Sequence, residues 1–406
     1  MTARAPLPAY QRRLLALLSV AAFFEGYDFI ALTQILPNLR TAMNIDRQTA
    51  GQMIALINAG TMVAYFLVRG ADRWGRKRVL TVTIAGYTSM TFLSGLAPGP
   101  WTFASLQMLG RIFLIAEYAT SMVIAAEEFP EDRRGLSIGL VGACSSLGSI
   151  VCAGLAPLLL KTSFGWRSVY FVGIVPLLLL AYARRGISET RRFVETGPAA
   201  ESRSFLYVFR TAHRRRVFQL GAIWFAAYIG SQSTVTFWKD FAVNERGFTD
   251  GDVGAAITVA AAVALPLVFS VPKLLDLLGR KPTAALVFLS GALGTVGCYT
   301  FHGRAALTAS LVLGVFAASA FLPVLNALTT ELFPTEIRAE GYAWANNVIG
   351  RIGYVLSPLV VGWAAEKAGW GPVVRLTAVG TLASLALVYL MLPETKNRTL
   401  EETSRL

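Results

Sequence analysis

The chain has 406 residues, of which 54% are hydrophobic and 15% charged, and its net charge is +13. A soluble domain carries about 25% charged residues, so this composition excludes an ordinary soluble protein and indicates a chain built for lipid. The two His and three Cys match no metal-ligand spacing, which excludes a zinc site or a disulfide framework, and we expect neither a metal nor a cofactor.

Long apolar windows follow one another along the chain. A transmembrane helix needs about 20 mainly apolar residues. We expect the first window to be retained as a helix rather than cleaved as a signal peptide, because its apolar run continues to Leu39. The pattern predicts an all-α membrane protein with twelve transmembrane helices. The twelve windows lie roughly at residues 14–36, 49–68, 79–97, 102–126, 135–160, 167–184, 217–238, 253–272, 282–301, 305–330, 341–364 and 371–392.

Internal repetition divides these spans into two halves. Three motifs recur at an offset of 204 residues, about half of the chain. Because the motifs keep their order, we expect two parallel repeats of six helices each, related by an axis along the membrane normal. The recurring pairs are Asp72–Lys77 with Asp276–Lys281, Glu127–Pro130 with Glu331–Pro334, and Arg134 with Arg338.

The positive charges lie mainly on one side of the expected membrane. The two termini, every second loop and the stretch between the halves share one side and hold 26 of the 37 Lys and Arg residues. The positive-inside rule puts this side, with both termini, in the cytoplasm of a multi-pass protein of the inner or plasma membrane. The basic charge is then an orientation signal facing lipid, and we expect no nucleic-acid partner. The expected domains are an N-terminal bundle (1–184), a cytoplasmic linker (185–216) and a C-terminal bundle with a tail (217–406).

The loop after the second span carries a recognisable signature. From Asp72 onward it is similar to the signature loop of the major facilitator superfamily, although Val68 stands where that signature begins with Gly. The Glu-x-x-Pro-x-x-x-Arg loops at 127–134 and 331–338, and the tail at 393–396, resemble the sugar-porter and organic-ion branches. The resemblance covers the whole chain and implies a transporter that works by alternating access.

The same resemblance implies a role for the charged loops. In the family such residues form a salt-bridge network that holds one conformer and breaks as the halves rock; the alternative is that they only set the topology. Gly75 is expected to supply a positive φ in the first loop. The residues assigned to this gating network are Asp72, Arg73, Gly75, Arg76, Lys77, Glu127, Arg134, Asp276, Gly279, Arg280, Lys281, Glu331 and Arg338.

Acidic residues inside the spans are candidates for proton coupling. A charge at mid-bilayer costs about 2.5–3.5 kcal/mol on insertion scales, so it indicates function. Glu25 and Asp28 are three residues apart and share a helix face, where two carboxylates repel and one can take up a proton. The segment from Glu25 to Asp28 resembles part of the first helix of proton-coupled aromatic-acid and metabolite symporters. Asp28 is the first candidate as proton carrier, with Glu25 and Glu117 as partners; a structural salt bridge from Asp28 to Arg111 is the alternative.

Arg351 is the basic residue near the middle of a span in the second half. Asn347, Arg351 and Tyr354 are spaced to share a helix face, and a guanidinium flanked by an amide and a phenol suits a carboxylate. A structural pair between Arg351 and a carboxylate of the first half is the alternative. Further polar residues at helical spacing indicate either a polar cavity or helix packing. The expected substrate contacts are Arg351, Asn347, Tyr354, Arg111, Asn58, Tyr228, Gln232 and Asn326.

These residues predict a proton-coupled secondary transporter of a small organic acid. The alternatives are a drug/H⁺ antiporter and a transporter of a sugar or another neutral solute. An enzyme is not expected, since His213 and His302 lie at or outside the membrane surface and no nucleophile–base set stands in the spans. We expect a monomer whose partners are the substrate, H⁺ and the lipid bilayer.

Overall fold

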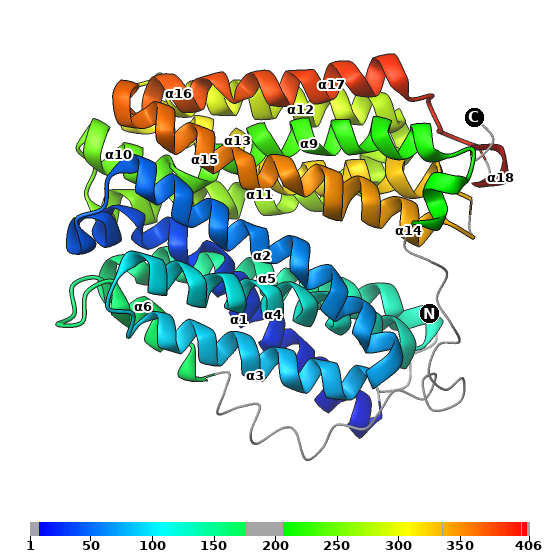
Figure 1. The fold of residues 1–406 in the computed structure, drawn as a ribbon, viewed down its shortest axis with the longest axis horizontal. Helices are drawn as coiled ribbons and strands as arrows, with labels where there is room; N and C mark the ends of the chain where they lie inside the picture. The colour runs from blue at the N-terminus through cyan, green and yellow to red at the C-terminus, as the bar shows by residue number, and fades with distance from the viewer. Residues whose placement is uncertain (1–7, 176–205, 335, 399, 404–406) are drawn as a thin grey trace, which may run out of the picture. The chain divides into compact units, whose positions relative to one another are not determined.

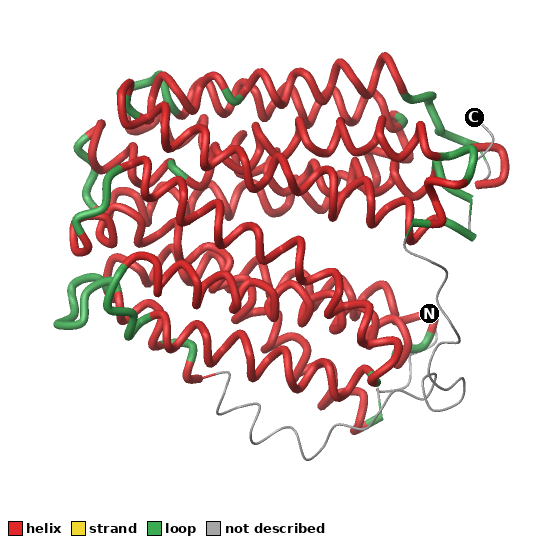
Figure 2. Tube along the Cα trace, viewed as in Figure 1, coloured by secondary structure: helices red, strands yellow, loops and turns green. Residues whose placement is uncertain are grey.

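The computed structural model describes residues 8–175, 206–334, 336–398 and 400–403. In this part of the chain every regular element is a helix, and no strand occurs (Figure 2). Long apolar sequences favour this result, because a helix satisfies all of its backbone hydrogen bonds internally and lipid offers no substitute. The expectation of an all-α architecture is confirmed.

The described helices fall into two groups along the chain, with residues 172–206 between them (Figure 1). The first group is α1 (Ala9–Met43), α2 (Arg47–Trp74), α3 (Arg76–Ser94), α4 (Pro100–Glu128), α5 (Glu131–Leu159) and α6 (Arg167–Phe171). The second group is the 3₁₀ turn η2 (Tyr207–Arg210), α9 (Arg214–Thr236), α10 (Trp238–Arg246), α11 (Asp250–Leu278), α12 (Arg280–Cys298), α13 (Arg304–Glu331), α14 (Arg338–Tyr342), the π-helical turn η3 (Ala343–Gly350), α15 (Arg351–Ala368), α16 (Trp370–Leu376), α17 (Ala378–Met391) and α18 (Leu400–Thr403).

Nine helices of the described residues are long and apolar enough to cross a membrane. Of the remaining expected spans, α3 and α9 form helices of 19 and 23 residues, roughly 28 and 34 Å long, but they begin with basic residues and carry more polar side chains. The sixth expected span, 167–184, runs beyond residue 175 and so partly outside the described residues. The count of twelve spans stays a prediction.

The helices group into two compact units, each considered by itself. The first unit comprises Met1–Leu32 and Val63–Ser202, and the second comprises Thr33–Met62 and Arg203–Leu406. The division therefore passes through α1 and α2. The expected linker, 185–216, lies largely outside the described residues, and the expected domain boundaries stay predictions.

In the first unit, glycines let α1 and α5 touch backbone to backbone. A Cβ atom at Gly26 would overlap the carbonyl of Ser145, and one at Gly148 would overlap the carbonyl of Phe23. Small residues of this kind are the usual means by which membrane helices approach closely. The approach brings the side chains of α5 next to the acidic face of α1.

In the second unit, α9 packs against α13, α17, η3 and α15. Figure 1 shows α9, α12 and α17 side by side in this unit. A Cβ atom at Gly350 would meet Trp224, and one at Gly353 would meet the carbonyl of Phe225, so the backbone of η3 and α15 runs directly along α9. This contact positions the polar residues of α9 against those of η3.

Large apolar side chains also lie on the outside of the helices. Leu136 is 72% exposed, Leu376 70% and Leu390 82%. Such side chains over entire helix faces are unfavourable in water and favourable against lipid tails. This surface agrees with a protein that is embedded in a membrane.

Two corresponding loops contain a glycine with positive φ. Gly75, between α2 and α3, has φ +92°, and Gly279, between α11 and α12, has φ +104°. An L-residue with a side chain rarely adopts such angles, so glycine is required at both turns. The positive φ expected at Gly75 is confirmed, and the copy 204 positions later has the same kind of turn.

Candidate functional site

Three acidic side chains inside the expected spans of the first unit are buried, and each receives a hydrogen bond from a hydroxyl group. Glu25 on α1 is 7% exposed, Asp28 on the same helix 9%, and Glu117 on α4 0%. The donors come from α5, α3 and α4. The donor–acceptor pairs are Ser145 Oγ to Glu25 Oε2, Thr91 Oγ1 to Asp28 Oδ2 and Ser121 Oγ to Glu117 Oε1, each at 2.6 Å.

The second oxygen of Glu117 is buried without a hydrogen-bond partner among the described residues. A fully buried carboxylate without a cation is very costly, whereas a neutral carboxylic acid needs much less solvation. Glu117 thus has the surroundings of a group that exchanges a proton rather than of a permanent ion.

Arg111 on α4 is buried near the acidic group but forms no ion pair within the described residues. Its guanidinium carbon lies 4.9 Å from the ring centre of Phe29, and its Nη1 has no hydrogen-bond partner there. Arg111 is within electrostatic range of Glu25 and Asp28. A direct salt bridge between Arg111 and Asp28, the alternative to a proton-carrying role, is not formed in the described part of the chain.

In the second unit, the side chain of Arg351 lies beside two tyrosine rings that contact each other. Its guanidinium carbon is 5.6 Å from the ring centre of Tyr228 on α9 and 5.6 Å from that of Tyr354 on α15. The two rings are 5.3 Å apart. Arg351 forms no ion pair in the described part of the chain, and its Nε is buried without a hydrogen-bond partner. Ring faces attract a cation by about 2 kcal/mol when it is desolvated, but they do not neutralise it.

A chain of four hydrogen-bonded side chains begins at Tyr228. The Tyr228 hydroxyl donates to Asn346 Oδ1 at 2.9 Å, and Asn346 Nδ2 donates to the Tyr342 oxygen at 2.7 Å. The Tyr342 hydroxyl donates to Asn326 Oδ1 at 2.8 Å. Sequence spacing predicted Tyr228 and Asn326 but missed Tyr342 and Asn346. The signal that could have found them is the paired amide of Asn346 and Asn347, of which only one can face α9.

The other predicted substrate contacts are not members of this hydrogen-bond series. Asn58 on α2 is buried and donates to the backbone carbonyl of Tyr354 at 3.0 Å. Asn347 and Gln232 are half-buried and make no side-chain hydrogen bond among the described residues. The structure thus brings Arg351, Tyr354, Tyr228, Asn58 and Asn326 together through shared contacts.

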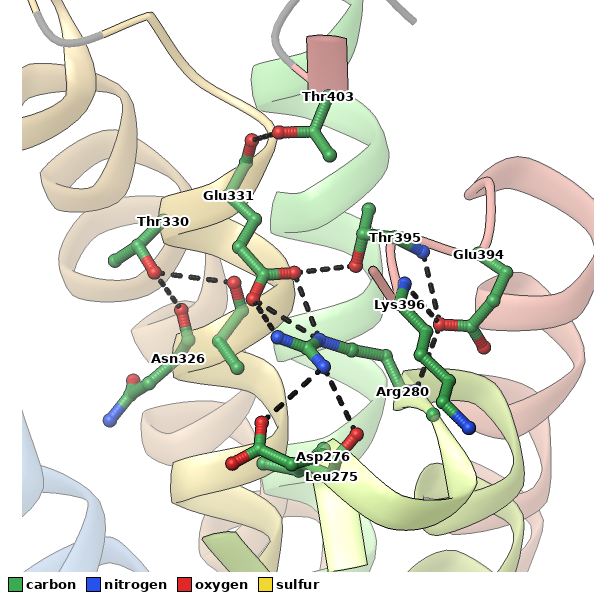
Figure 3. A network of polar contacts seen from close by, with 12 residues as sticks. Leu275, Asp276, Arg280, Asn326, Thr330, Glu331, Glu394, Thr395, Lys396 and Thr403 are labelled. Carbon is green, nitrogen blue, oxygen red and sulfur yellow. Dashed lines mark hydrogen bonds and ion pairs between the residues drawn. The ribbon is translucent and has the colours of Figure 1, made fainter. Parts of the chain in front are cut away.

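A polar network at the end of the second unit joins α12, α13 and the tail (Figure 3). Arg280 Nη2 lies 2.6 Å from Glu331 Oε1, and its Nε is 3.1 Å from both oxygens of that carboxylate. Asp276 is farther away, at 3.7 Å from Arg280 Nη1. The Thr395 hydroxyl donates to Glu331 Oε2. The predicted gating residues Asp276, Arg280 and Glu331 are therefore in one network.

Glu394 in the tail closes the N-terminus of α12. Its carboxylate accepts the backbone N–H groups of Arg280 and Lys281 at 2.9 and 2.8 Å, and those of Thr395 and Lys396 at 3.0 Å. Burial alone would raise the pKa of Glu394, but the four backbone donors outweigh it and hold that pKa below its usual range. The contact requires a glycine at 279, where a Cβ atom would meet this carboxylate.

The first unit contains the corresponding pair. Arg76 Nη2 lies 3.3 Å from Glu127 Oε1. Lys77, the next residue after Arg76, is half-buried. In the second unit its copy, Lys281, donates a hydrogen bond to the carbonyl of Tyr389 at 3.2 Å. Arg338 donates to the carbonyl of Phe333 at 3.2 Å, a contact that closes its own loop. The side chains of Asp72, Arg73 and Arg134, also predicted for gating, lie outside the described residues.

A second charged cluster, which sequence reasoning missed, surrounds α10 at the end of the second unit opposite α18 (Figure 1). Asp240 is fully buried and accepts hydrogen bonds from Arg40 on α1, from Trp370 Nε1 and from Asn244. Lys239 is 1% exposed; it lies 2.6 Å from Asp250 Oδ1 and donates to the carbonyl of Gln34. The sequence pattern showed these charges only as a loop between two spans, because nothing local reveals that they are buried.

The start of α2 belongs to the same region. Asp46 caps the helix by accepting the backbone N–H of Thr49 at 2.6 Å. Hydrogen bonds from Thr49 hold the pKa of Asp46 below its usual range. Farther along α2, Gly51 packs on Gly362 of α15, where a Cβ atom on either would overlap the other backbone. Within the second unit, these contacts fasten the ends of α1 and α2 to α10, α15 and α16.

Comparison with known proteins identifies the family. The model of the Major Facilitator Superfamily matches residues 18–351 and, in a second match, residues 223–405. The chain belongs to the Major Facilitator Superfamily. As a member of this superfamily it is a transporter rather than an enzyme, and a multi-pass protein of the cell membrane.

Relatives of known name and a solved structure agree with this assignment to the Major Facilitator Superfamily. A putative metabolite transport protein of Haemophilus influenzae is 27% identical and covers 93% of this chain and 95% of its own length. A 3-(3-hydroxy-phenyl)propionate transporter of Escherichia coli is 27% identical over 96% of this chain and 97% of its own. The structure of a D-xylose–proton symporter superposes with a TM-score of 0.77 at 18% identity, over 96% of this chain and all of that one, which shows the shared fold.

Proposed function

We propose that the protein moves a small organic acid across the membrane together with H⁺ by alternating access. In this proposal the chain has twelve spans, both termini face the cytoplasm, and a monomer is the working unit. The substrate carboxylate binds Arg351 in the second half, and the carboxyl groups of the first half exchange the proton. The linker, 185–216, connects the halves on the cytoplasmic side.

The observation that carries the proposal is the unpaired charge of Arg351. A guanidinium inside a span needs an anion, and among the described residues no carboxylate lies within ion-pair distance. The two adjacent tyrosines favour the cation, but its Nε stays without a hydrogen-bond partner among the described residues. A substrate carboxylate can accept two parallel hydrogen bonds from such a fork.

Two further observations support the substrate class and the coupling. The 27% identical Escherichia coli relative is named for 3-(3-hydroxy-phenyl)propionate, an aromatic ring joined to a carboxylate by two carbons. The tyrosine rings beside Arg351 suit such a ring by offset or edge contact. The solved symporter with the same fold is named for proton coupling, and Glu25, Asp28 and Glu117 supply carboxyl groups for the same task here.

The Arg76–Glu127 and Arg280–Glu331 pairs act as gates in this proposal. Each joins the start of one helix to the end of the next on the side that we assign to the cytoplasm. The α10 cluster is the counterpart on the opposite side, where Arg40 and Asp240 link the end of α1 to the second half. Transport then requires the two sets of contacts to break and form in turn.

The test is uptake by proteoliposomes with an imposed pH gradient. Radiolabelled benzoate and 3-phenylpropionate serve as probes, and wild type should accumulate at least one of them when the inside is alkaline. Arg351→Gln should abolish accumulation and binding, and Arg351→Lys should recover part of the binding because it keeps the charge but not the fork.

Arg375→Gln is the matched control. Arg375 on α16 bonds the carbonyl of Gly371 at 3.3 Å and Thr300 at 3.5 Å, so its loss should leave uptake near the wild-type level. Uptake that ignores the pH gradient would contradict proton coupling. Normal binding of the carboxylate by Arg351→Gln would contradict the substrate site. Accumulation of a neutral sugar, or of a drug when the inside is acidic, would favour the two alternative functions.

A further inference from the structure

The π-helical turn at 343–350 changes which residue of the Asn346–Asn347 pair faces α9. In a regular α-helix, Asn347 lies one turn before Arg351 and shares its face. A π turn bonds residue i to i+5 and rotates the following residues around the axis. Asn346 is therefore the buried amide, at 4% exposure, and Asn347 points to a half-buried position. Turns of this kind are rare and occur frequently at functional sites.

Four side chains at this turn form a hydrogen-bond series in which each group donates to the next one. Tyr228 donates to Asn346, Asn346 donates to Tyr342, and Tyr342 donates to Asn326. A phenol has one proton to donate and two lone pairs. Since the proton of Tyr228 is used by Asn346, the Tyr228 oxygen can only accept a further hydrogen bond.

Arg351 beside the ring of Tyr228 offers the opposite capacity. A guanidinium has five N–H donors and no acceptor. The pair of Arg351 and Tyr228 thus presents a fork of donors next to one acceptor. A plain carboxylate satisfies the donors and leaves the Tyr228 oxygen without a partner, whereas a carboxylate that also carries a hydroxyl or N–H group satisfies both.

We propose that Asn346, held by the π turn and by Tyr342, is a positioning residue that keeps Tyr228 an acceptor and thereby selects carboxylates bearing a hydrogen-bond donor. The inference rests on the proposed function, because it needs the substrate carboxylate at Arg351. Sites built to bond a hydroxyl reject analogues that cannot donate, since their own polar groups are left unpaired. We expect a preference of about tenfold, which corresponds to about 1.4 kcal/mol.

The experiment compares ligands that differ only in the donor. Purified full-length protein is titrated calorimetrically with the three monohydroxybenzoates and the three matching methoxybenzoates, since a methoxy oxygen accepts but does not donate. For at least one position of the ring, the hydroxy compound should bind wild type about tenfold more tightly. Asn346→Leu frees the Tyr228 proton, which can then serve the methoxy oxygen, so the ratio should fall to near one.

Three further variants separate positioning from a general loss of structure. Val348→Ala, a change in the same turn that removes no hydrogen-bonding group, should keep the tenfold ratio. Asn346→Asp still accepts the Tyr228 proton and should keep it too. Tyr342→Phe removes the acceptor that orients the Asn346 amide, so it should lower the ratio without the volume change of Asn346→Leu.

The outcomes are distinct for the two proposals. If no benzoate binds in a manner that Arg351→Gln abolishes, the proposed function and this inference both fall. If binding depends on Arg351 but wild type does not discriminate hydroxy from methoxy compounds, the inference alone is overturned. It is equally overturned if Asn346→Leu and Tyr342→Phe both keep the wild-type ratio.

Discussion

Arg280 and Glu331 form a bidentate ion pair between the first residue of α12 and the last residue of α13. Their copies 204 positions earlier, Arg76 and Glu127, form an ion pair at 3.3 Å between α3 and α4, and the partners of each pair are 51 residues apart. The two halves of the chain thus build one contact twice, at corresponding helix ends. Side chains in these pairs are 9–16% exposed, so water screens them only in part.

Neutralising one partner of these pairs should change transport more than folding. A half-buried pair of this kind contributes about 1 kcal/mol, roughly fivefold in a conformer equilibrium. We expect Arg280→Gln and Arg76→Gln each to slow uptake several-fold, with the melting temperature nearly unchanged. The double variant Arg280→Glu with Glu331→Arg should recover part of the rate. Uptake kinetics in both single variants that match wild type would exclude the gating role.

Glu394 should stabilise the second unit in a pH-dependent manner. Its pKa in the folded protein is below the ordinary value of about 4.3, so its contribution is present above pH 4.3 and is lost as the pH falls through the folded value. Glu394→Gln should therefore lower the melting temperature at pH 7, by the equivalent of about 1 kcal/mol. Below pH 4 the melting curves of the variant and the wild type should converge. A difference that is constant from pH 7 to pH 3.5 would contradict this account.

The Arg40–Asp240 pair should show strong coupling in a double-mutant cycle. Asp240 is fully buried, so removing Arg40 alone leaves an incompletely compensated charge, which costs about 3 kcal/mol or more. Arg40→Met should thus destabilise the protein strongly, and Asp240→Asn added to it should restore much of the loss. Thermal unfolding in detergent measures the stability of the single and the double variant. The exposed pair of Arg304 and Asp252 is the control, since Arg304→Met should shift the melting temperature by at most about 2 °C. Additive effects of the Arg40 and Asp240 substitutions would disprove the coupling.

Proton coupling should depend on Asp28 and Glu117 but not on the neighbouring Tyr27. Asp28→Asn should abolish accumulation driven by a pH gradient and retain exchange of labelled for unlabelled substrate, because exchange needs no net proton transfer. Glu117→Gln should have the same effect, because its second oxygen is buried without a hydrogen-bond partner among the described residues. Tyr27→Phe removes only a hydroxyl bonded to the carbonyl of Val169, and coupling should persist. Gradient-driven accumulation by both carboxyl variants would rule out these residues as carriers.

Local sequence was sufficient for the helices and for the repeated ion pairs. Apolar windows correspond to helices because lipid demands internal backbone hydrogen bonds. The family resemblance implied ion pairs between these loops, and the offset of 204 indicated that each half would contain its own copy, as Arg76 with Glu127 and Arg280 with Glu331 do. Both depend on composition and order along the chain. The expected position of Arg351 beside Tyr354 belongs here as well, because three residues along a helix share a face.

Helical spacing failed at the π turn. Counting 3.6 residues per turn puts Asn347 beside Arg351, whereas one π turn makes Asn346 the amide that bonds Tyr228. The residues of a π turn look like those of any other apolar helix, and this turn lies where the backbone of η3 and α15 packs against α9 at Gly350 and Gly353. That contact is tertiary, so no local pattern could have revealed it.

The sequence by itself determined that this is a membrane protein, that it consists of two related halves and that few charged residues lie inside its spans. Only the tertiary structure decided which of those charges lack a partner, as Arg351 does among the described residues, and which loop charges are buried, as Lys239 and Asp240 are. The physical reason is range. Hydrophobicity and helical period act between neighbours in the chain, whereas burial and ion pairing depend on side chains brought together from 200 residues apart, as Arg40 and Asp240 are.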